Sequence, residues 1–398
     1  MKIGVWLNNR IKATIGGGAS YSNRLVYLLD NYQFAENVEI CFFSVIPIEG
    51  LKKEVICISQ LPSIIYKLFA WSDFATNKIQ GLDRRLVMMR GLKRVLKGTD
   101  IKLVYYIQQA FTLDSSFPSV HNNWDIGHRS TFPFPEVMDE GEFEYREKFY
   151  QKQLPKALMI ICESETGKQE LIDYTNIGSH KIRVMPIFAG SVSSLTIPDN
   201  RIKEILCKFG LESKRFFYYP AQFWAHKNHV GLLKAFREFI NQVDDGHKLV
   251  LSGSNVGGNR EYVEQVAIQL GILDKVVFLG FISEEEVYSL YCNATCLVMA
   301  SHFGPTNMPP IEAMELNCPV VCSDIGGHRE ILGDAAVYFN SFDYMSIFEG
   351  IKDVYNNREK YQNRIVIQKT KTLFNSDYAI KRLDEILQEV VVIRSNWE

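Results

Sequence analysis

The chain lacks any apolar run long enough to cross a bilayer, although 46% of its 398 residues are hydrophobic. The apolar run near its N-terminus, Ile3–Leu7, is too short for a signal peptide. A basic excess is also missing, because 44 Lys and Arg stand against 46 Asp and Glu. These absences argue against a membrane-spanning protein, a secreted protein and a nucleic-acid binder, and we expect a cytoplasmic location.

Two nucleotide-binding signatures are absent as well. The triplet Gly16–Gly18 follows the first expected strand, but it belongs neither to a G-x-G-x-x-G pattern nor to a P-loop. Neither dinucleotide nor triphosphate binding therefore follows from it. A glycine loop between a strand and a helix still lets the backbone approach a ligand closely, and the alternative is a flexible turn.

The eight cysteines do not form a recognisable zinc pattern. Cys292 and Cys296, and likewise Cys318 and Cys322, are separated by three residues instead of the usual two, and they lie in or beside apolar strands. We interpret them as small buried hydrophobic residues, which stay reduced in the cytoplasm.

Strand-like and helix-like segments alternate along both halves of the chain. Strands are expected at 2–7, 38–45, 54–58, 102–107, 158–162, 216–220, 248–252, 276–279, 295–300, 320–322 and 336–339. Such alternation predicts parallel sheets that are covered by helices on both faces. Periodicity stops around 188–200, where Gly, Ser and Pro concentrate, so two domains should meet there. The chain closes with an amphipathic helix over 375–393, for which Ser376 is the expected N-cap.

A loop with two prolines leads from the strand at 295–300 into good helix formers. Proline is tolerated in a first helical turn, so a helix should begin at about 309–310. Its start would leave the N–H groups of Asn307 and Met308 free to bind an anion, with Glu312 nearby to accept hydrogen bonds from ligand hydroxyls. The alternative is a proline-capped helix without a ligand.

Lys227 lies beside the start of a second expected helix, over 230–241. A lysine is a poor partner for the positive end of a helix dipole, so this placement makes sense if an anion binds between the two. Gly253, Gly280 and the pair at 326–327 follow other strand ends. All of these residues should therefore meet at the carboxyl edge of one parallel sheet.

Residues 120–135 are rich in Asn, His, Trp, Phe and Pro, which suits a binding loop. His121, Asp125, His128 and Arg129 give this loop groups that bind sugars or transfer protons. Each of them is otherwise an ordinary polar group of the surface.

Residues 64–97 mix aromatic and aliphatic side chains with basic ones, among them Lys67, Arg84, Arg85, Arg90, Lys93, Arg94 and Lys97. A basic amphipathic helix of this kind binds anionic membrane surfaces, which would make the protein peripheral to the inner face of the cell membrane. A solvated helix face is the alternative, and it is the commoner use of such a pattern.

Three segments in this order, 216–229, 301–312 and 323–332, resemble retaining glycosyltransferases of the GT4 type, or glycosyltransferase group 1. The resemblance covers essentially the whole chain. It implies the GT-B fold, an α/β architecture of two facing Rossmann-like domains with doubly wound parallel sheets. The implied domains are an acceptor-binding domain at 1–190, a nucleotide-sugar-binding domain at 191–374, and a crossover helix at 375–398 that returns to the first domain.

The resemblance also implies the chemistry. A hexosyl or deoxyhexosyl group would pass, with retention, from a nucleotide-diphosphate sugar to a glycan or lipid-linked glycan during bacterial surface polysaccharide (O-antigen or capsule) biosynthesis. No further cofactor is implied. The sequence contains no D-x-D pair, so no metal site is expected and Lys227 with a helix N-terminus would stabilise the leaving diphosphate. The alternatives are a nucleotide-sugar-binding protein without transfer activity, or another GT-B enzyme such as an epimerase.

The site residues implied by the resemblance fall into two groups. The catalytic group is Lys227, Asp125 and His128. The donor-binding group is Gly17, Gly18, Gln222, Lys227, Gly280, Thr306, Asn307, Met308 and Glu312, with Glu312 on the ribose hydroxyls.

Three positions depart from the family pattern. Gly304 replaces the first Glu of E-x7-E, Gln222 falls near the usual arginine, and Trp124 precedes Asp125 where His is usual. Without the first carboxylate, the site is suited to a deoxy sugar such as rhamnose or fucose, unless Asn307 takes over the contact to an ordinary hexose.

Overall fold

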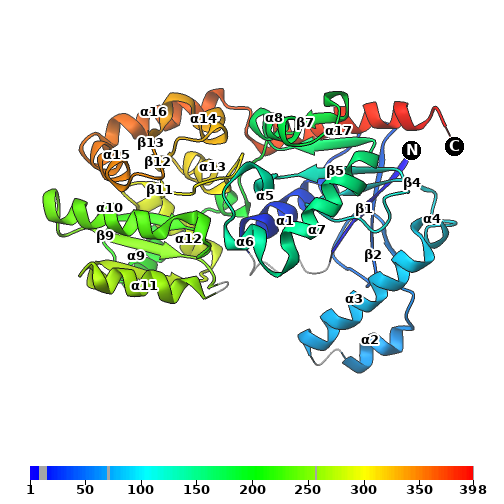
Figure 1. The fold of residues 1–398 in the computed structure, drawn as a ribbon, viewed down its shortest axis with the longest axis horizontal. Coiled ribbons are helices and arrows are strands. Elements are labelled where there is room, and N and C mark those ends of the chain that lie inside the picture. The colour runs from blue at the N-terminus through cyan, green and yellow to red at the C-terminus, as the bar shows by residue number, and fades with distance from the viewer. Residues whose placement is uncertain (9–15, 70–71, 256–257, 398) are drawn as a thin grey trace.

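The computed structural model describes residues 1–8, 16–69, 72–255 and 258–397. The chain forms two α/β domains, each built on one parallel sheet (Figure 1). The first domain is coloured blue to green and the second green to orange. Within the described ranges, no helix is long and apolar enough to pass through a bilayer.

The first sheet has seven strands in the order β3-β2-β1-β4-β5-β6-β7, all parallel. Its strands are β1 (Lys2–Trp6), β2 (Glu39–Ser44), β3 (Val55–Cys57), β4 (Ile101–Tyr106), β5 (Ser119–Asn123), β6 (Met159–Cys162) and β7 (Ile182–Val184). Its helices are α1 (Gly16–Asn31), α2 (Ser63–Phe69), α3 (Asp73–Arg90), α4 (Leu92–Val95), α5 (Gly127–Ser130), α6 (Pro135–Met138), α7 (Glu142–Lys148) and α8 (Glu165–Tyr174).

The second sheet has six parallel strands in the order β10-β9-β8-β11-β12-β13. Its strands are β8 (Phe216–Pro220), β9 (Lys248–Ser252), β10 (Val276–Gly280), β11 (Leu297–Met299), β12 (Val320–Ser323) and β13 (Val337–Phe339). The later helices are α9 (Asp199–Lys208), α10 (His229–Gln242), α11 (Asn259–Gln269), α12 (Glu284–Asn293), α13 (Met308–Glu315), α14 (Gly326–Leu332), α15 (Tyr344–Asn356), α16 (Arg358–Lys371) and α17 (Ser376–Arg394).

Both sheets have the same type of strand order. The chain first adds strands outward on one side of the first strand, then reverses direction, crosses over and adds the remaining strands on the other side. In the first sheet the reversal lies between β1 and β4, and in the second between β8 and β11. Loops at such a reversal diverge to opposite faces and leave a crevice at the carboxyl edge. The loops that follow β8 and β11 carry Lys227 and Asn307, so the topology brings these two residues together.

All six strands expected in the second half are confirmed. They are largely apolar runs, and the four inner strands are buried almost throughout, whereas the edge strands β10 and β13 are partly exposed. Two strands of the first half were not expected, β5 and β7. The binding-loop interpretation is wrong for residues 120–123, which belong to the buried strand β5. Its polar side chains pair inside the domain: the Tyr105 hydroxyl donates to Asn122 Oδ1 at 2.8 Å, and the Tyr150 hydroxyl donates to Asn123 Oδ1 at 2.6 Å.

Three helix starts differ from the expected ones by a few residues. The glycine triplet does not form a loop, because α1 already begins at Gly16. Helix α13 begins at Met308, just before the expected start, with Asn307 as its N-cap. The last helix is capped by Asn375 and not by Ser376, since the Asn375 side chain accepts a hydrogen bond from Tyr378 N.

The last helix, α17, lies along the first domain, and the chain ends close to its N-terminus (Figure 1). Asp384 accepts a hydrogen bond from Ala35 N at 3.3 Å, and Glu389 forms an ion pair with Arg183. The expected boundary at 190/191 lies in the connection between β7 and α9. Helix α9 already packs against α12 of the second domain.

Candidate functional site

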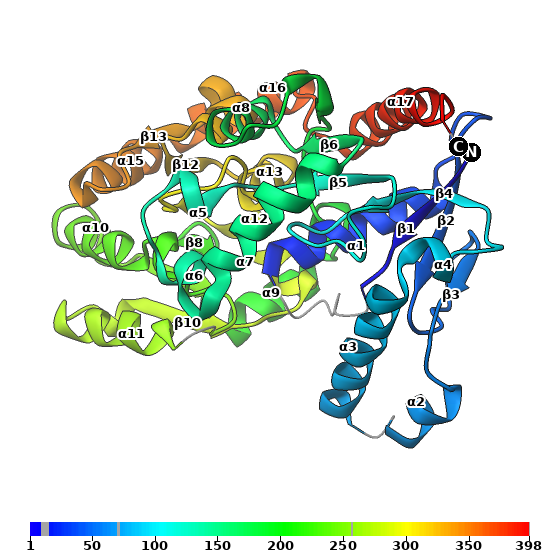
Figure 2. The ribbon, with the colours of Figure 1, turned by 45° about the vertical axis from the view of Figure 1, so that its right-hand side comes forward.

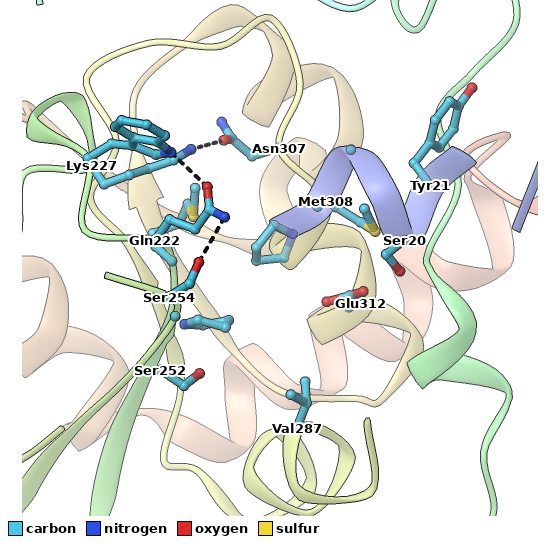
Figure 3. Close-up of a pocket in the computed structure, with 18 of the residues that line it drawn as sticks. Ser20, Tyr21, Gln222, Lys227, Ser252, Ser254, Val287, Asn307, Met308 and Glu312 are labelled. Carbon is cyan, nitrogen blue, oxygen red and sulfur yellow. Dashed lines mark hydrogen bonds between the residues drawn. The ribbon is translucent and has the colours of Figure 1, made fainter. Parts of the chain in front are cut away.

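A cavity of about 500 Å³ lies between the carboxyl edges of the two sheets (Figure 3). The first domain contributes Gly17, Gly18, Ser20, Tyr21, Trp124, Asp125 and Glu163. The second domain contributes Gln222, Lys227, Ser252, Ser254, Gly280, Thr306, Asn307, Met308 and Glu312. All nine residues expected to bind the donor therefore line this one cavity.

A second cavity, of about 270 Å³, shares Asp125, Glu163, Lys227 and Thr306 with the first. It extends between the domains toward Glu136 of the first domain and is closed on the other side by the Phe303–Pro305 segment. The interdomain space thus has two connected compartments, and Lys227 lies at their junction.

Lys227 ends a short 3-10 helix, Ala225–Lys227, that follows β8. Its ammonium donates to Asn307 Oδ1 at 2.9 Å, across the reversal point of the second sheet (Figure 3). Burial lowers the pKa of Lys227 to about 8, since Glu136 and Asp125 only partly offset the lost hydration. This cation has no carboxylate partner within salt-bridge distance in the described part of the chain, so an anionic ligand would stabilise it.

Asn307 is itself held by His328, which is fully buried on α14. The Asn307 amide group donates to His328 Nε2 at 3.1 Å, while His328 Nδ1 donates to the carbonyl of Ser323 at 2.8 Å. Burial lowers the pKa of His328 to about 4, so the ring stays neutral and keeps Nε2 as an acceptor. The chain of hydrogen bonds fixes which end of the Asn307 amide faces Lys227.

Helix α14 packs closely against the loop that precedes α13. A Cβ added to Gly327 would lie 1.4 Å from the carbonyl oxygen of Pro305. Gly304 has φ +122°, a backbone conformation that favours glycine. Gly327 therefore allows α14 to pack closely against this loop, whereas Gly326 faces Thr166 of the first domain. The glycine at 304 satisfies a backbone requirement that a glutamate would meet only with strain.

Glu312 lies in the second turn of α13 and is 7% exposed. Its Oε2 accepts a hydrogen bond from the Tyr291 hydroxyl at 2.9 Å. Burial raises the pKa of Glu312 to about 7 despite this bond. In Figure 3 its carboxylate faces the cavity beside Met308 and Ser20, where ligand hydroxyls can reach it.

Gln222 occupies the wall opposite Glu312 (Figure 3). Its amide nitrogen donates to Ser254 Oγ at 3.1 Å, and its oxygen accepts from Trp224 Nε1 at 2.7 Å. These bonds tie the loop after β8 to the end of β9. Gln222 is thus a neutral wall residue near the place where an arginine was expected. Among the described residues that line this cavity, Lys227 is the one lysine or arginine.

The start of α1 forms the first-domain wall. A Cβ on Gly18 would lie 2.8 Å from the Trp124 ring, and one on Gly17 would be 3.5 Å from Met308. Small residues here allow α1 to approach both the indole and the second domain. Gly280, with φ +67°, ends β10 at the far end of the same cavity, next to the half-exposed Phe281.

Asp125 lines both cavities, whereas His128 lines neither of them. Burial raises the pKa of Asp125, but Arg146 at 2.8 Å and the Gly127 N–H more than offset this and hold it below the usual range. His128 packs instead against Tyr150 and bonds to Glu147 at 3.1 Å. The catalytic role of His128 stays a prediction, and the structure does not bring its ring to the cavity.

Several lining residues were missed by sequence reasoning. Glu163 and Ser254 follow strand ends and Ser252 is the last residue of β9, and such positions are a signal that the sequence does contain. Arg146 and Glu136 carry no such signal, because they come from short helices that only the tertiary fold brings to the cavity. Among the described residues, no three His, Cys, Asp or Glu side chains gather in a group that could hold a metal ion.

Two facing parallel sheets with a cavity at their shared carboxyl edges are the GT-B architecture, and solved structures agree. A sucrose-phosphate synthase from Thermosynechococcus elongatus superimposes with a TM-score of 0.73 at 17% identity, covering 98% of this chain and 99% of that one. WaaG, a glycosyltransferase involved in lipopolysaccharide biosynthesis, gives 0.67 at 13% identity, covering 96% and 99%. The protein therefore has the GT-B fold.

The sequence comparisons then name the family. Residues 202–371 match the family described as glycosyl transferases group 1, which confirms the resemblance over this part of the chain. The O-antigen chain mannosyltransferase RfbU of Salmonella typhimurium is 29% identical over 230 residues, 55% of this chain and 59% of that protein. O-antigen chain mannosyltransferase B of Escherichia coli is 27% identical over 221 residues, 55% and 57%. The alignments thus span less than two thirds of these relatives.

The two shifted pKa values predict how the cavity binds a nucleoside diphosphate as pH changes. Glu312 becomes an anion, and a stronger acceptor for ribose hydroxyls, above about pH 7, while Lys227 loses its positive charge above about pH 8. Affinity for GDP or UDP in isothermal titration calorimetry should therefore be highest between these values and fall on both sides.

The Glu312→Gln variant separates the effect of Glu312 on the pH dependence of nucleotide affinity from that of Lys227. The terminal phosphate of the ligand titrates near pH 6 by itself, so the diagnostic is the difference between wild type and variant. In Glu312→Gln, the part of the affinity loss below about pH 7 that is due to Glu312 should disappear. The loss of affinity above about pH 8 should remain, because Lys227 is unchanged. An affinity that stays constant from pH 7 to 9.5 would contradict the assignment of Lys227 as the anion-binding group.

Proposed function

We propose that the protein transfers a hexose, mannose in the first instance, from a nucleoside-diphosphate sugar to a hydroxyl of a glycan or lipid-linked glycan. The observation that carries the proposal is the half-buried Lys227, whose ammonium lies 2.9 Å from Asn307 Oδ1 at the N-terminus of α13. A lysine without a carboxylate partner beside a helix N-terminus is suited to a diphosphate.

The chemistry follows from where charge develops. When the bond between the sugar and the phosphate breaks, negative charge grows on the leaving diphosphate. Lys227 and the first N–H groups of α13 would stabilise that charge. With the acceptor on the same face, the leaving phosphate would take the proton of the attacking hydroxyl, and the sugar would keep its configuration.

The names of similar proteins suggest which sugar the donor carries. Those named above are O-antigen mannosyltransferases, and solved neighbours include Anabaena HepE in complex with UDP-glucose. These names support a nucleotide-linked hexose and a role in surface polysaccharide synthesis. A deoxy sugar remains the rival donor, since the segment 304–307 offers no carboxylate to an extra hydroxyl.

The acceptor would enter through the smaller cavity. Glu136 of α6 accepts from the backbone N–H of His226 at 2.8 Å and also contacts its ring, which links the two domains at this entrance. Asp125 and Arg146 form the opposite wall. Polar walls that are already paired can orient a sugar hydroxyl without leaving buried charges unsatisfied.

A donor panel tests the proposal directly. GDP-mannose, UDP-glucose and dTDP-rhamnose are offered in thermal-shift and calorimetric titrations, and transfer to lipid-linked glycan acceptors is followed by mass spectrometry. Binding and transfer of the mannosyl group support the proposal. Binding without transfer to any acceptor favours a nucleotide-sugar-binding protein, and preferred use of dTDP-rhamnose favours the deoxy-sugar donor.

The Lys227→Ala variant should lose most of its turnover. Removing a preorganised cation from a leaving diphosphate costs about 3 kcal/mol, roughly a hundredfold in kcat. The matched control is Lys234→Ala, which changes an exposed lysine on the neighbouring helix α10. Near wild-type kcat/KM in Lys227→Ala, measured with the best donor of the panel, would remove Lys227 from the mechanism.

Transfer should proceed without a divalent ion, because Lys227 and the α13 N-terminus take the place of metal-bound charge. Initial rates in excess EDTA should match those with added Mg²⁺ or Mn²⁺. A rate that vanishes in EDTA and returns only with metal would contradict this prediction.

Membrane contact through residues 64–97 is a further part of the proposal. Helices α2 and α3 extend away from both sheets (Figure 2), and the apolar side chains of Leu68 and Met89 on them are 62% and 83% exposed. Exposed basic residues follow at Arg90, Lys93 and Arg94. Apolar and basic side chains together are typical of a surface that binds anionic lipid.

The protein should therefore sediment with vesicles that contain anionic lipid at low salt and detach at high salt. Changing Arg90, Lys93 and Arg94 to Gln should abolish sedimentation. The control changes three basic residues of α16, Lys360, Arg364 and Lys371, and removes the same charge from the second domain. Equal sedimentation of both variants would indicate a solvated helix face.

A further inference from the structure

We propose that Glu163, a residue of the first domain, forms part of the binding site for the transferred sugar and accepts hydrogen bonds from its hydroxyls. The proposal rests on the proposed function, since it assigns a contact to the same donor. It also gives the first domain, expected to bind the acceptor, a direct part in donor recognition.

The position of Glu163 is set by the end of β6. The chain leaves the sheet there and enters α8, whose N-cap is Ser164. Glu163 is 6% exposed and lines both the 500 Å³ and the 270 Å³ cavities, as do Lys227 and Thr306. It therefore lies where the diphosphate compartment meets the acceptor compartment, and a transferred sugar has to occupy this junction.

The carboxylate of Glu163 has unused hydrogen-bonding capacity. Its Oε2 accepts from Thr306 Oγ1 at 2.7 Å, across the domain boundary. In the ranges that the structure describes, its side chain has no second hydrogen bond and no salt bridge, although a carboxylate accepts about four hydrogen bonds. Burial, with a smaller contribution from Asp125, raises the pKa of Glu163 to about 8. A buried carboxylate in this state is stabilised by neutral hydroxyl donors.

The other carboxylates around the second cavity are already paired. Asp125 binds Arg146 and the Gly127 N–H, and Glu136 binds His226. Each of these two carboxylates thus has a guanidinium, imidazole or backbone N–H partner at one oxygen. Among the described residues that line this cavity, Glu163 is the carboxylate whose one side-chain partner is a hydroxyl.

The segment that faces Glu163 supplies no alternative acceptor of comparable strength. Gly304 and Pro305 have no polar side chain, and Thr306 donates its hydroxyl to Glu163. Asn307 uses its oxygen for Lys227 and its nitrogen for His328. A sugar held between Lys227 and this segment would therefore find its strongest acceptor across the boundary, on β6.

The test compares a nucleotide with and without the sugar. Dissociation constants for GDP and GDP-mannose are measured by calorimetry with wild type, Glu163→Gln and Glu330→Gln. Glu330 is the matched control because it also bridges the domains, accepting from Glu165 N at 2.8 Å and Thr166 N at 2.9 Å, yet lines neither cavity. Loss of an interdomain bond alone should therefore appear in both variants.

Above about pH 8, where Glu163 is ionised, we expect Glu163→Gln to weaken GDP-mannose binding about tenfold and to change GDP binding less than twofold, since a charged acceptor is replaced by a neutral one. Glu330→Gln should leave the ratio of the two constants unchanged. The same dissociation constants are then measured for GDP-mannose analogues that each lack one hydroxyl of the mannose. The penalty of Glu163→Gln should vanish for the analogue that lacks the hydroxyl which Glu163 accepts.

Equal weakening of GDP and GDP-mannose, or no weakening of either, would overturn the proposal and leave Glu163 as a bridge between domains. Thr306→Val provides a second variant, which keeps the carboxylate but removes the bond that positions it, and it should also weaken GDP-mannose selectively. Wild-type protein that binds and transfers mannose while both variants keep wild-type selectivity contradicts this inference alone. Wild-type protein that binds no donor of the panel overturns the proposed function as well.

Discussion

The partial burial of one lysine cation between two sheets is the constraint on which the rest of the site depends. Lys227 leaves bulk water at the end of β8, and the nearest polar partner it acquires is a neutral amide, Asn307. Losing hydration without gaining an anion is unfavourable, as its lowered pKa shows. His328 holds that amide in one orientation through a bond to a backbone carbonyl. The site is thus preorganised for an anion before any ligand arrives.

Buried carboxylates face the same cavity and, within the part of the chain that the structure describes, also lack a partner of opposite charge, one of them on the other side of the domain boundary. Glu163 and Glu312 are buried carboxylates that face the cavity, and each has one hydroxyl partner from the protein. Burial raises the pKa of both. The cavity therefore places one unpaired cation near acceptors that await hydroxyl donors. A nucleoside-diphosphate sugar offers a diphosphate and many hydroxyls in one molecule, so a single ligand of the proposed kind would compensate the burial of all three groups.

The sequence predicted the second domain better than the first. Its strands are continuous apolar runs separated by clear turn signals, so all six were found. In the first domain β5 was interpreted as part of a polar loop, because its two Asn side chains find their hydrogen-bond partners inside the core. Local patterning does not reveal such pairing, which depends on Tyr105 and Tyr150 from other elements. For the same reason His128 was expected at the site, whereas it packs against Tyr150.

What the sequence by itself determined is the sheet class, the order of elements, and the residues that follow strand ends, including Lys227 and Asn307. Parallel strands place their carboxyl ends along one edge, so a linear pattern is sufficient to gather such residues. Only the tertiary structure decided which groups of the first domain meet them. Glu163 and Thr306 are 2.7 Å apart although they are 143 positions apart in the chain. Their contact depends on how two separately folded sheets face each other, and no periodicity along the chain encodes that orientation.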